Sequence, residues 1–137
     1  MNKDDIELIV SDVLLNFSKD IKKPVVLFLE KKRFSHFLDM MNLKKHLSKT
    51  PCFVAEMKGG DVIYYCEEII NELTKGMYKD KKKMFVEAVT IHELYHIWNK
   101  IEVGNQEDAL FSEELVWEET KKEYPEHYKL LKKFSKR

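Results

Sequence analysis

The sequence predicts an α+β fold in which a small mixed β-sheet with a hairpin packs on an N-terminal helix and a long helix at 83–101, followed by a helix at 106–123 and a short C-terminal helix. Three observations predict it: helical spacing of apolar residues over 3–21, two β-branched stretches at 24–30 and 52–66, and a long apolar helical pattern over 83–101. No repeat, low-complexity tract or linker interrupts the 137 residues, so we expect one domain, 1–137.

The N-terminal third predicts a helix, a strand and a second short helix. Residues 3–21 carry apolar side chains at helical spacing, namely Ile6, Ile9, Val10, Val13, Leu14, Phe17 and Ile21. The stretch PVVLFLE from Pro24 is short and β-branched, which predicts a strand in the middle of the sheet. Residues 33–48 predict a short helix followed by a loop.

The middle of the chain predicts a β-hairpin and a short helix. CFVAEMK and DVIYYC flank Gly59-Gly60, which can supply the positive φ of a tight turn. A short helix should run from Glu67 to Lys75, with Gly76 at its C-terminal end. The basic run YKDKKK, 78–83, is expected to be a solvated loop.

The last part of the chain predicts three helices. The first covers roughly 83–101 and ends near Gly104. Asn105 is a plausible N-cap for the next, 106–123. Pro125 ends that helix, and EHYKLLKKFSKR forms a short basic C-terminal helix.

Composition excludes several classes of function. Lys and Arg number 24 and Asp and Glu number 24, so the formal net charge is zero, which argues against a nucleic-acid or anionic-membrane binder. No apolar run approaches the roughly 18 residues of a membrane span, and no signal-peptide core is visible. Two cysteines, Cys52 and Cys66, are too few for a disulfide framework, so a cytoplasmic location is expected. Their thiols could face each other across the hairpin or lie on opposite sides of it.

The stretch VEAVTIHELYHIWNKI, 86–101, predicts a metal site. At about 100° per residue, His92 and His96 lie one turn apart on one helix face, the spacing that lets two imidazoles bind one ion. Glu93 lies beside that face and can reach a water held by the metal, as in the motif H-E-x-x-H. The alternative is a metal-free histidine pair, but most of this helix is apolar, and burying three such groups without an ion is costly.

A catalytic zinc ion normally takes a third protein ligand and keeps one position for water. The next helix offers seven acids: Glu107, Asp108, Glu113, Glu114, Glu118, Glu119 and Glu123. Its apolar residues, Ala109, Leu110, Val116, Trp117 and Tyr124, cluster in one arc. Glu113 falls near the middle of that arc and Glu114 at its edge, so Glu113 is the predicted third ligand and Glu114 the second choice. The other acids are expected to form a solvated face.

HELYH followed by a buried glutamate on the next helix resembles the gluzincin class of zinc metallopeptidases, and the size is similar to that of minigluzincins and of peptidase domains of antirepressor proteins. The resemblance implies one Zn²⁺ per chain on His92, His96 and Glu113, with Glu93 as general base in the hydrolysis of a peptide or protein substrate. It also implies that an edge strand, for which we expect Asp61–Cys66, binds the substrate backbone. A latent form is plausible, with His127 as a fourth ligand.

Several points stay open in the sequence. Tyr64, Tyr65, Tyr124 and His127 are weak candidates for stabilising the oxyanion, because boundary tyrosines more often pack. Tyr95, inside the motif, should face away from the histidine pair. A regulatory or binding module that retains zinc with little or no proteolytic activity is the alternative function. We expect no nucleic-acid or membrane partner, and the oligomeric state is undetermined.

Overall fold

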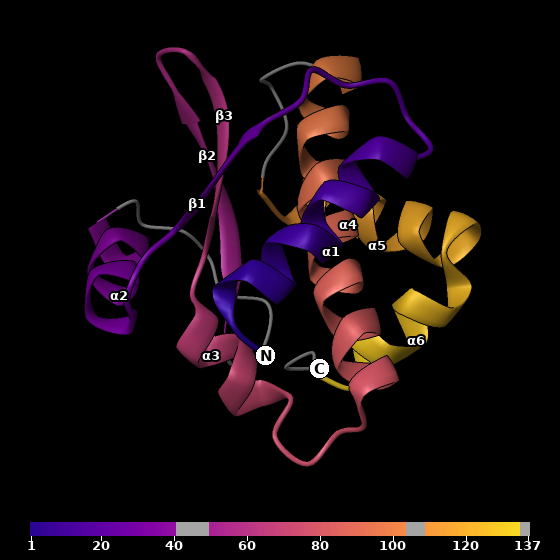
Figure 1. The fold of residues 1–137 in the computed structure, drawn as a ribbon. Coiled ribbons are helices and arrows are strands. Elements are labelled where there is room, and N and C mark those ends of the chain that lie inside the picture. The colour runs from indigo at the N-terminus through magenta and orange to yellow at the C-terminus, as the bar shows by residue number, and fades with distance from the viewer. Residues whose placement is uncertain (41–49, 104–108, 135–137) are drawn as a thin grey trace.

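A computed structural model describes residues 1–40, 50–103 and 109–134, and within these it does not place the side chains of 101–103 and 109–112. Six helices and three strands are found in these ranges (Figure 1). In chain order they are α1 (Lys3–Asn16), β1 (Val25–Phe28), α2 (Lys31–Met40), β2 (Cys52–Met57), β3 (Gly60–Tyr65), α3 (Glu67–Leu73), α4 (Lys79–Val103), α5 (Ala109–Glu123) and α6 (Pro125–Lys132). The predicted α+β class, with a small mixed sheet and the expected order of helices, is confirmed.

Helix α1 is shorter than predicted. It begins with a capping box in which the Asn2 side chain accepts from the Asp5 backbone and the Asp5 side chain accepts from the Asn2 backbone. It ends at Asn16, because Phe17 adopts an extended backbone with ψ 139°. Ser18 then donates its backbone N–H to the Tyr124 hydroxyl. A tertiary contact therefore ends a helix whose apolar pattern continues to Ile21.

The sheet has the order β1-β3-β2, which corrects the prediction for β1. β1 is parallel to β3 and lies at an edge, whereas β3 lies in the centre and β2 pairs with it antiparallel. The predicted hairpin is present, but its two-residue turn is Lys58-Gly59, because Met57 pairs with Gly60. Gly60 alone of the two glycines has a positive φ, 131°.

The two faces of the sheet belong to different cores. Cys52, Ile63 and Tyr65 point toward α1 and α4 in the main core, whereas Phe53 and Tyr64 pack on the other face. Helix α2 covers part of this second face, on the opposite side of the sheet from α4 (Figure 1). The side-chain alternation of paired strands therefore divides the hairpin between two environments.

Helix α4 is the centre of the molecule and contacts β2, α1, α5 and α6. It starts at Lys79, so most of the run predicted as a solvated loop is its first turn, and Lys82 donates its backbone N–H to the Tyr78 carbonyl. Buried Thr90 bonds back to the Val86 carbonyl and accepts from the Tyr65 hydroxyl at 2.7 Å. This bond joins α4 to the central strand.

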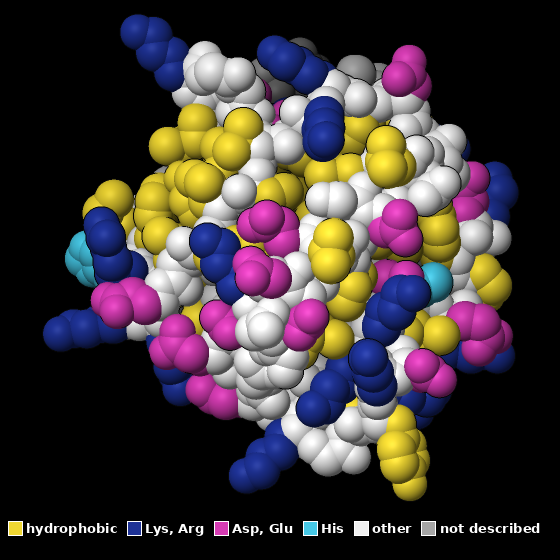
Figure 2. Space-filling view, in the orientation of Figure 1, with side chains coloured by type: hydrophobic (Ala, Val, Ile, Leu, Met, Phe, Trp, Pro, Cys, Tyr) yellow, Lys and Arg dark blue, Asp and Glu magenta, His cyan; other side chains and the backbone are white. Residues whose placement is uncertain are grey.

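Helices α5 and α6 follow the predicted order, and Pro125 occupies the first turn of α6. The predicted N-cap at Asn105 and the acids Glu107 and Asp108 lie outside the described residues. Charges of both signs are interspersed over the face in Figure 2, and apolar side chains gather on the side where Figure 1 shows the sheet. In the described part of the chain, no helix combines the length and apolar character that crossing a membrane requires.

Candidate metal site

The two motif histidines and Glu113 meet between α4 and α5. The Nε2 atom of His96 lies 2.6 Å from Glu113 Oε1, and the Nε2 atom of His92 lies 3.3 Å from the same oxygen. The helical turn between the histidines directs both rings to one side of α4, with their centroids 5.0 Å apart. Glu113 is 4 % exposed and His92 is 8 % exposed, so this carboxylate and imidazole are held in the interior.

Glu93 lies beside this group and contacts the sheet. One of its carboxylate oxygens accepts the backbone N–H of Val54 at 3.0 Å. β2 pairs only with β3 among the described strands, and the N–H of Val54 points away from β3 toward α4. Glu93 therefore lies between the histidine pair and the unpaired edge of β2.

The group has the donor types and spacing that a metal ion requires. His92, Glu93 and His96 each offer a ligand atom within 4.8 Å of the other two. Zinc bonds of about 2.0–2.1 Å in a tetrahedral site place two ligand atoms about 3.3 Å apart. The distance from His92 Nε2 to Glu113 Oε1 matches that spacing, whereas the 2.6 Å from His96 is a hydrogen-bond length that an ion would widen.

His92 differs from most histidine metal ligands in the surroundings of its second ring nitrogen, Nδ1. Such histidines usually donate the other ring N–H to an acceptor. His92 Nδ1 is buried and has no hydrogen-bond partner among the described residues. The Trp117 ring packs on His92 with centroids 4.9 Å apart, so an apolar contact rather than a hydrogen bond orients this imidazole.

The electrostatics of the site favour an ionised Glu113 carboxylate in contact with the two imidazoles. Burial opposes the charged form of Glu113, but the hydrogen bonds and charge interactions with His92 and His96 together outweigh burial and hold the pKa of Glu113 well below its usual range. For His96, burial lowers the pKa, but the bond to Glu113 and the negative charges of Glu93 and Glu113 together outweigh burial, so the pKa is raised. Burial raises the pKa of Glu93, opposed by the neighbouring imidazoles. The pKa of Glu93 is therefore raised while the pKa of the neighbouring Glu113 is lowered.

The structure distinguishes the candidate acids of α5 as the helical phase predicted. Glu113 is buried, whereas Glu114 and Glu118 are exposed. Glu123, expected on a solvated face, is exposed, and it also accepts a 2.5 Å hydrogen bond from the Tyr95 hydroxyl. Glu119 and Glu123 both lie within ion-pair distance of Lys19.

The remaining predicted residues lie elsewhere. His127 contacts Glu87 at 3.1 Å and is not in the histidine group. The Tyr65 hydroxyl is bound to Thr90, and Tyr64 packs on the far face of the sheet, so neither reaches the site. Cys52 and Cys66 are both buried and free. They belong to opposite faces of the sheet, which decides the alternative that the sequence left open.

Sequence reasoning missed two groups near the site. The Val54 N–H is a backbone group, which no residue type reveals. Lys100, one turn after His96, donates to Asp61 at 2.5 Å and lies 3.3 Å from Glu56, so it joins α4 to the hairpin. Lys100 follows His96 by four residues and so lies on the same helix face, and this spacing could have identified it from the sequence as a residue near the site.

No protein-family model matches the chain, and no significant match was found among the curated proteins or the solved structures. The resemblance to gluzincins therefore depends on the motif residues and on the position of Glu113, and it stays a prediction.

Proposed function

We propose that this chain is a zinc-dependent metallopeptidase that binds one zinc ion through His92, His96 and Glu113. The observation that carries the proposal is the position of the buried Glu113 carboxylate against the Nε2 atoms of both motif histidines. Two imidazoles and one carboxylate are a common ligand set of catalytic zinc, and they leave a fourth position for water. Bound zinc would lower the pKa of that water and polarise a substrate carbonyl.

Glu93 is the proposed general base. Its raised pKa brings the carboxyl closer to the range in which it can accept a proton and later return it to a leaving amine. Its bond to the Val54 N–H holds the carboxylate beside the histidines. In this role Glu93 would accept the proton at a carboxylate oxygen, while His92, His96 and Glu113 would hold the ion.

The edge of β2 is the proposed contact for the substrate backbone. The sequence assigned this role to Asp61–Cys66, but β3 is central and paired on both sides, so that assignment is wrong. Among the described strands β2 pairs on one side only, and an extended peptide could add to its other edge, next to Glu93. Such pairing would bring a scissile bond close to the base.

A zinc-retaining binding module is the second candidate. The bond between Glu93 and Val54 favours it, because a carboxylate engaged by the sheet has less freedom to act on water. In either case we infer a cytoplasmic protein, since both buried cysteines are free thiols.

Metal analysis and one isosteric substitution test the proposal. We expect elemental analysis to find one zinc per chain, and we expect cleavage of a fluorogenic peptide library. Glu93→Gln should keep the zinc and lose cleavage, because an amide cannot accept the proton. Glu87→Gln, on the same helix but bound to His127, is the matched control and should keep both.

Absence of zinc from the native protein would refute the proposal. Zinc binding without cleavage in either form would support the binding module. Full cleavage by Glu93→Gln would refute the assignment of the base.

A further inference from the structure

Two consecutive residues of the motif contact α5 at two separated positions, Glu113 in its second turn and Glu123 at its C-terminal end. His96 contacts Glu113 at 2.6 Å, and the hydroxyl of Tyr95 donates to Glu123 at 2.5 Å. Neighbouring residues on a helix diverge by about 100°, so these side chains leave α4 in different directions. Glu113 and Glu123 are ten residues apart, which is about 15 Å along a helix axis. Helix α5 therefore lies across α4 and is attached to it at two separated points.

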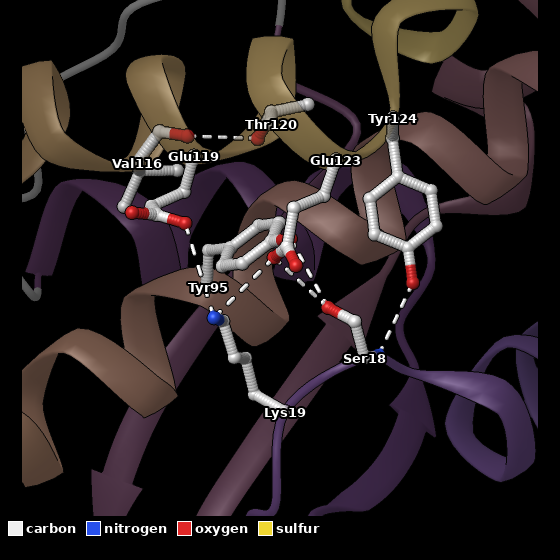
Figure 3. Close-up of polar contacts among 8 residues, drawn as sticks. All are labelled: Ser18, Lys19, Tyr95, Val116, Glu119, Thr120, Glu123 and Tyr124. Carbon is white, nitrogen blue, oxygen red and sulfur yellow. Dashed lines mark hydrogen bonds and ion pairs between the residues drawn. The ribbon is translucent and has the colours of Figure 1, made fainter.

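The attachment at Glu123 includes the segment that follows α1 (Figure 3). Ser18 Oγ lies 3.2 Å from the Tyr95 hydroxyl and 3.1 Å from Glu123 Oε1. Lys19 Nζ lies 3.5 Å from the same carboxylate oxygen. We name Tyr95, Glu123, Ser18 and Lys19 the Tyr95–Glu123 junction. It joins three segments that are distant in sequence, and it uses no residue of the proposed zinc site.

The contact between the two attachment points is apolar. Ile91 and Val116 form a small cluster with the Tyr95 ring. Apolar burial is non-directional, so such a contact holds helices together without fixing their crossing angle closely. Directional hydrogen bonds from a buried group can fix register, as single polar residues do in coiled coils. In the junction the buried group is Tyr95, whereas its acceptor Glu123 is exposed. The Tyr95 side chain is fully buried, so its hydroxyl depends on the junction for polar partners.

A zinc site on His92, His96 and Glu113 requires a closely fixed orientation of α5 relative to α4. Metal–ligand distances are held to within about 0.2 Å. A rotation of α5 by about 5° around Glu123 would move a point 15 Å away by about 1.3 Å, which is several times that tolerance. We propose that the Tyr95–Glu123 junction positions α5 so that Glu113 reaches the ion held by His92 and His96. The proposal rests on the proposed zinc site, and it makes Tyr95 and Glu123 positioning residues.

Zinc affinity measured by competition with a chromophoric chelator tests this inference. Tyr95→Phe keeps the ring and removes the hydroxyl, and Glu123→Ala removes the side-chain acceptor of the Tyr95 and Ser18 bonds. Each should weaken zinc binding about tenfold, the lower end of the range for residues that orient ligands. Glu126→Gln is the control, because within the described part of the chain Glu126 pairs with Lys129, on an exposed part of α6. It should leave the affinity unchanged.

Repeating the Tyr95→Phe measurement in a Glu113→Ala protein distinguishes a positioning role of Tyr95 from a general effect on stability. In Glu113→Ala, α5 supplies no ligand, so Tyr95→Phe should change the zinc affinity of that variant less than about twofold. An equal loss in both backgrounds would mean that Tyr95 acts through overall stability, and it would overturn the inference. Unchanged affinity of both single variants in the native background would also overturn it.

The failure of the zinc site itself would look different. Native protein that binds no zinc in the same titration would refute the proposed function, and the junction would then have no ligand to position. Circular dichroism of each variant verifies its fold, and Glu123→Ala provides the result if Tyr95→Phe does not fold.

Discussion

Lys100, one turn beyond His96 on α4, donates to Asp61 on β3 at 2.5 Å. The same ammonium lies 3.3 Å from Glu56, which pairs with Asp61 across the hairpin. This arrangement connects the helix that carries the histidines to the strand whose free edge contacts Glu93. The distance between β2 and the proposed zinc site is therefore held at two places, by Lys100 and by the Glu93–Val54 bond.

Lys100→Met should loosen the hairpin. It removes a charged hydrogen bond and leaves Asp61 beside Glu56 without the cation, so we expect the free energy of unfolding to fall by about 1–2 kcal/mol. Hydrogen exchange should become faster in 52–65 while α1 keeps its protection. Lys129→Met, which removes the exposed pair with Glu126, is the control and should change neither quantity. Unchanged exchange in the hairpin would contradict this role of Lys100.

Glu113→Ala and Glu114→Ala should differ strongly in zinc retention, although the residues are adjacent. Glu113 is buried against the imidazoles and Glu114 is exposed. Loss of a ligand should weaken zinc binding by more than about 100-fold, beyond the usual effect of outer residues. Elemental analysis after dialysis against a chelator would measure this. Equal retention by the two variants would place the third ligand elsewhere.

The contribution of Glu123 to stability should depend on pH. The bond from Tyr95, followed by those from Ser18 and Lys19, lowers the pKa of Glu123 below its usual value. A lowered folded-state pKa gives stability that is present above the unfolded-state value, about 4.3, and is lost as the pH falls through the folded-state value. The native protein should thus be more stable than Glu123→Gln by about 1 kcal/mol at pH 7.

Urea unfolding of metal-free protein between pH 7 and pH 3.5 tests this dependence. The difference between the two proteins should shrink below about pH 4.3, as the native carboxylate takes up its proton. A difference that stays constant over this range would show that the charge of Glu123 contributes nothing.

Cys52 and Cys66 should stay reduced under mild oxidation of the folded protein. Their thiols lie on opposite faces of the sheet and are buried, so a bond between them would require the strands to separate. Oxidation followed by alkylation in denaturant and mass spectrometry should find two modified thiols per chain. A species lighter by two hydrogens and without label would contradict the assigned faces.

The sequence by itself determined the features that depend on local periodicity. Four-residue spacing placed His92 and His96 on one side of a helix, and helical phase separated the buried Glu113 from the exposed Glu114. The hairpin was recognisable from two β-branched runs around Gly59-Gly60, although the turn lies one residue earlier. These features need only the geometry of a single element.

Only the tertiary structure decided how the elements meet. Strand order depends on long-range pairing, so the sequence could not tell that β1 is an edge strand or that β2, rather than β3, faces Glu93. Likewise, helical phase correctly placed Glu123 on an exposed face but gave no sign of its bond to Tyr95, and it predicted that α1 would continue to residue 21, whereas it ends at Asn16. Ser18, Tyr95 and Glu123 acquire their roles through contacts between residues 28 to 105 positions apart, and periodicity within one helix carries no information about such contacts.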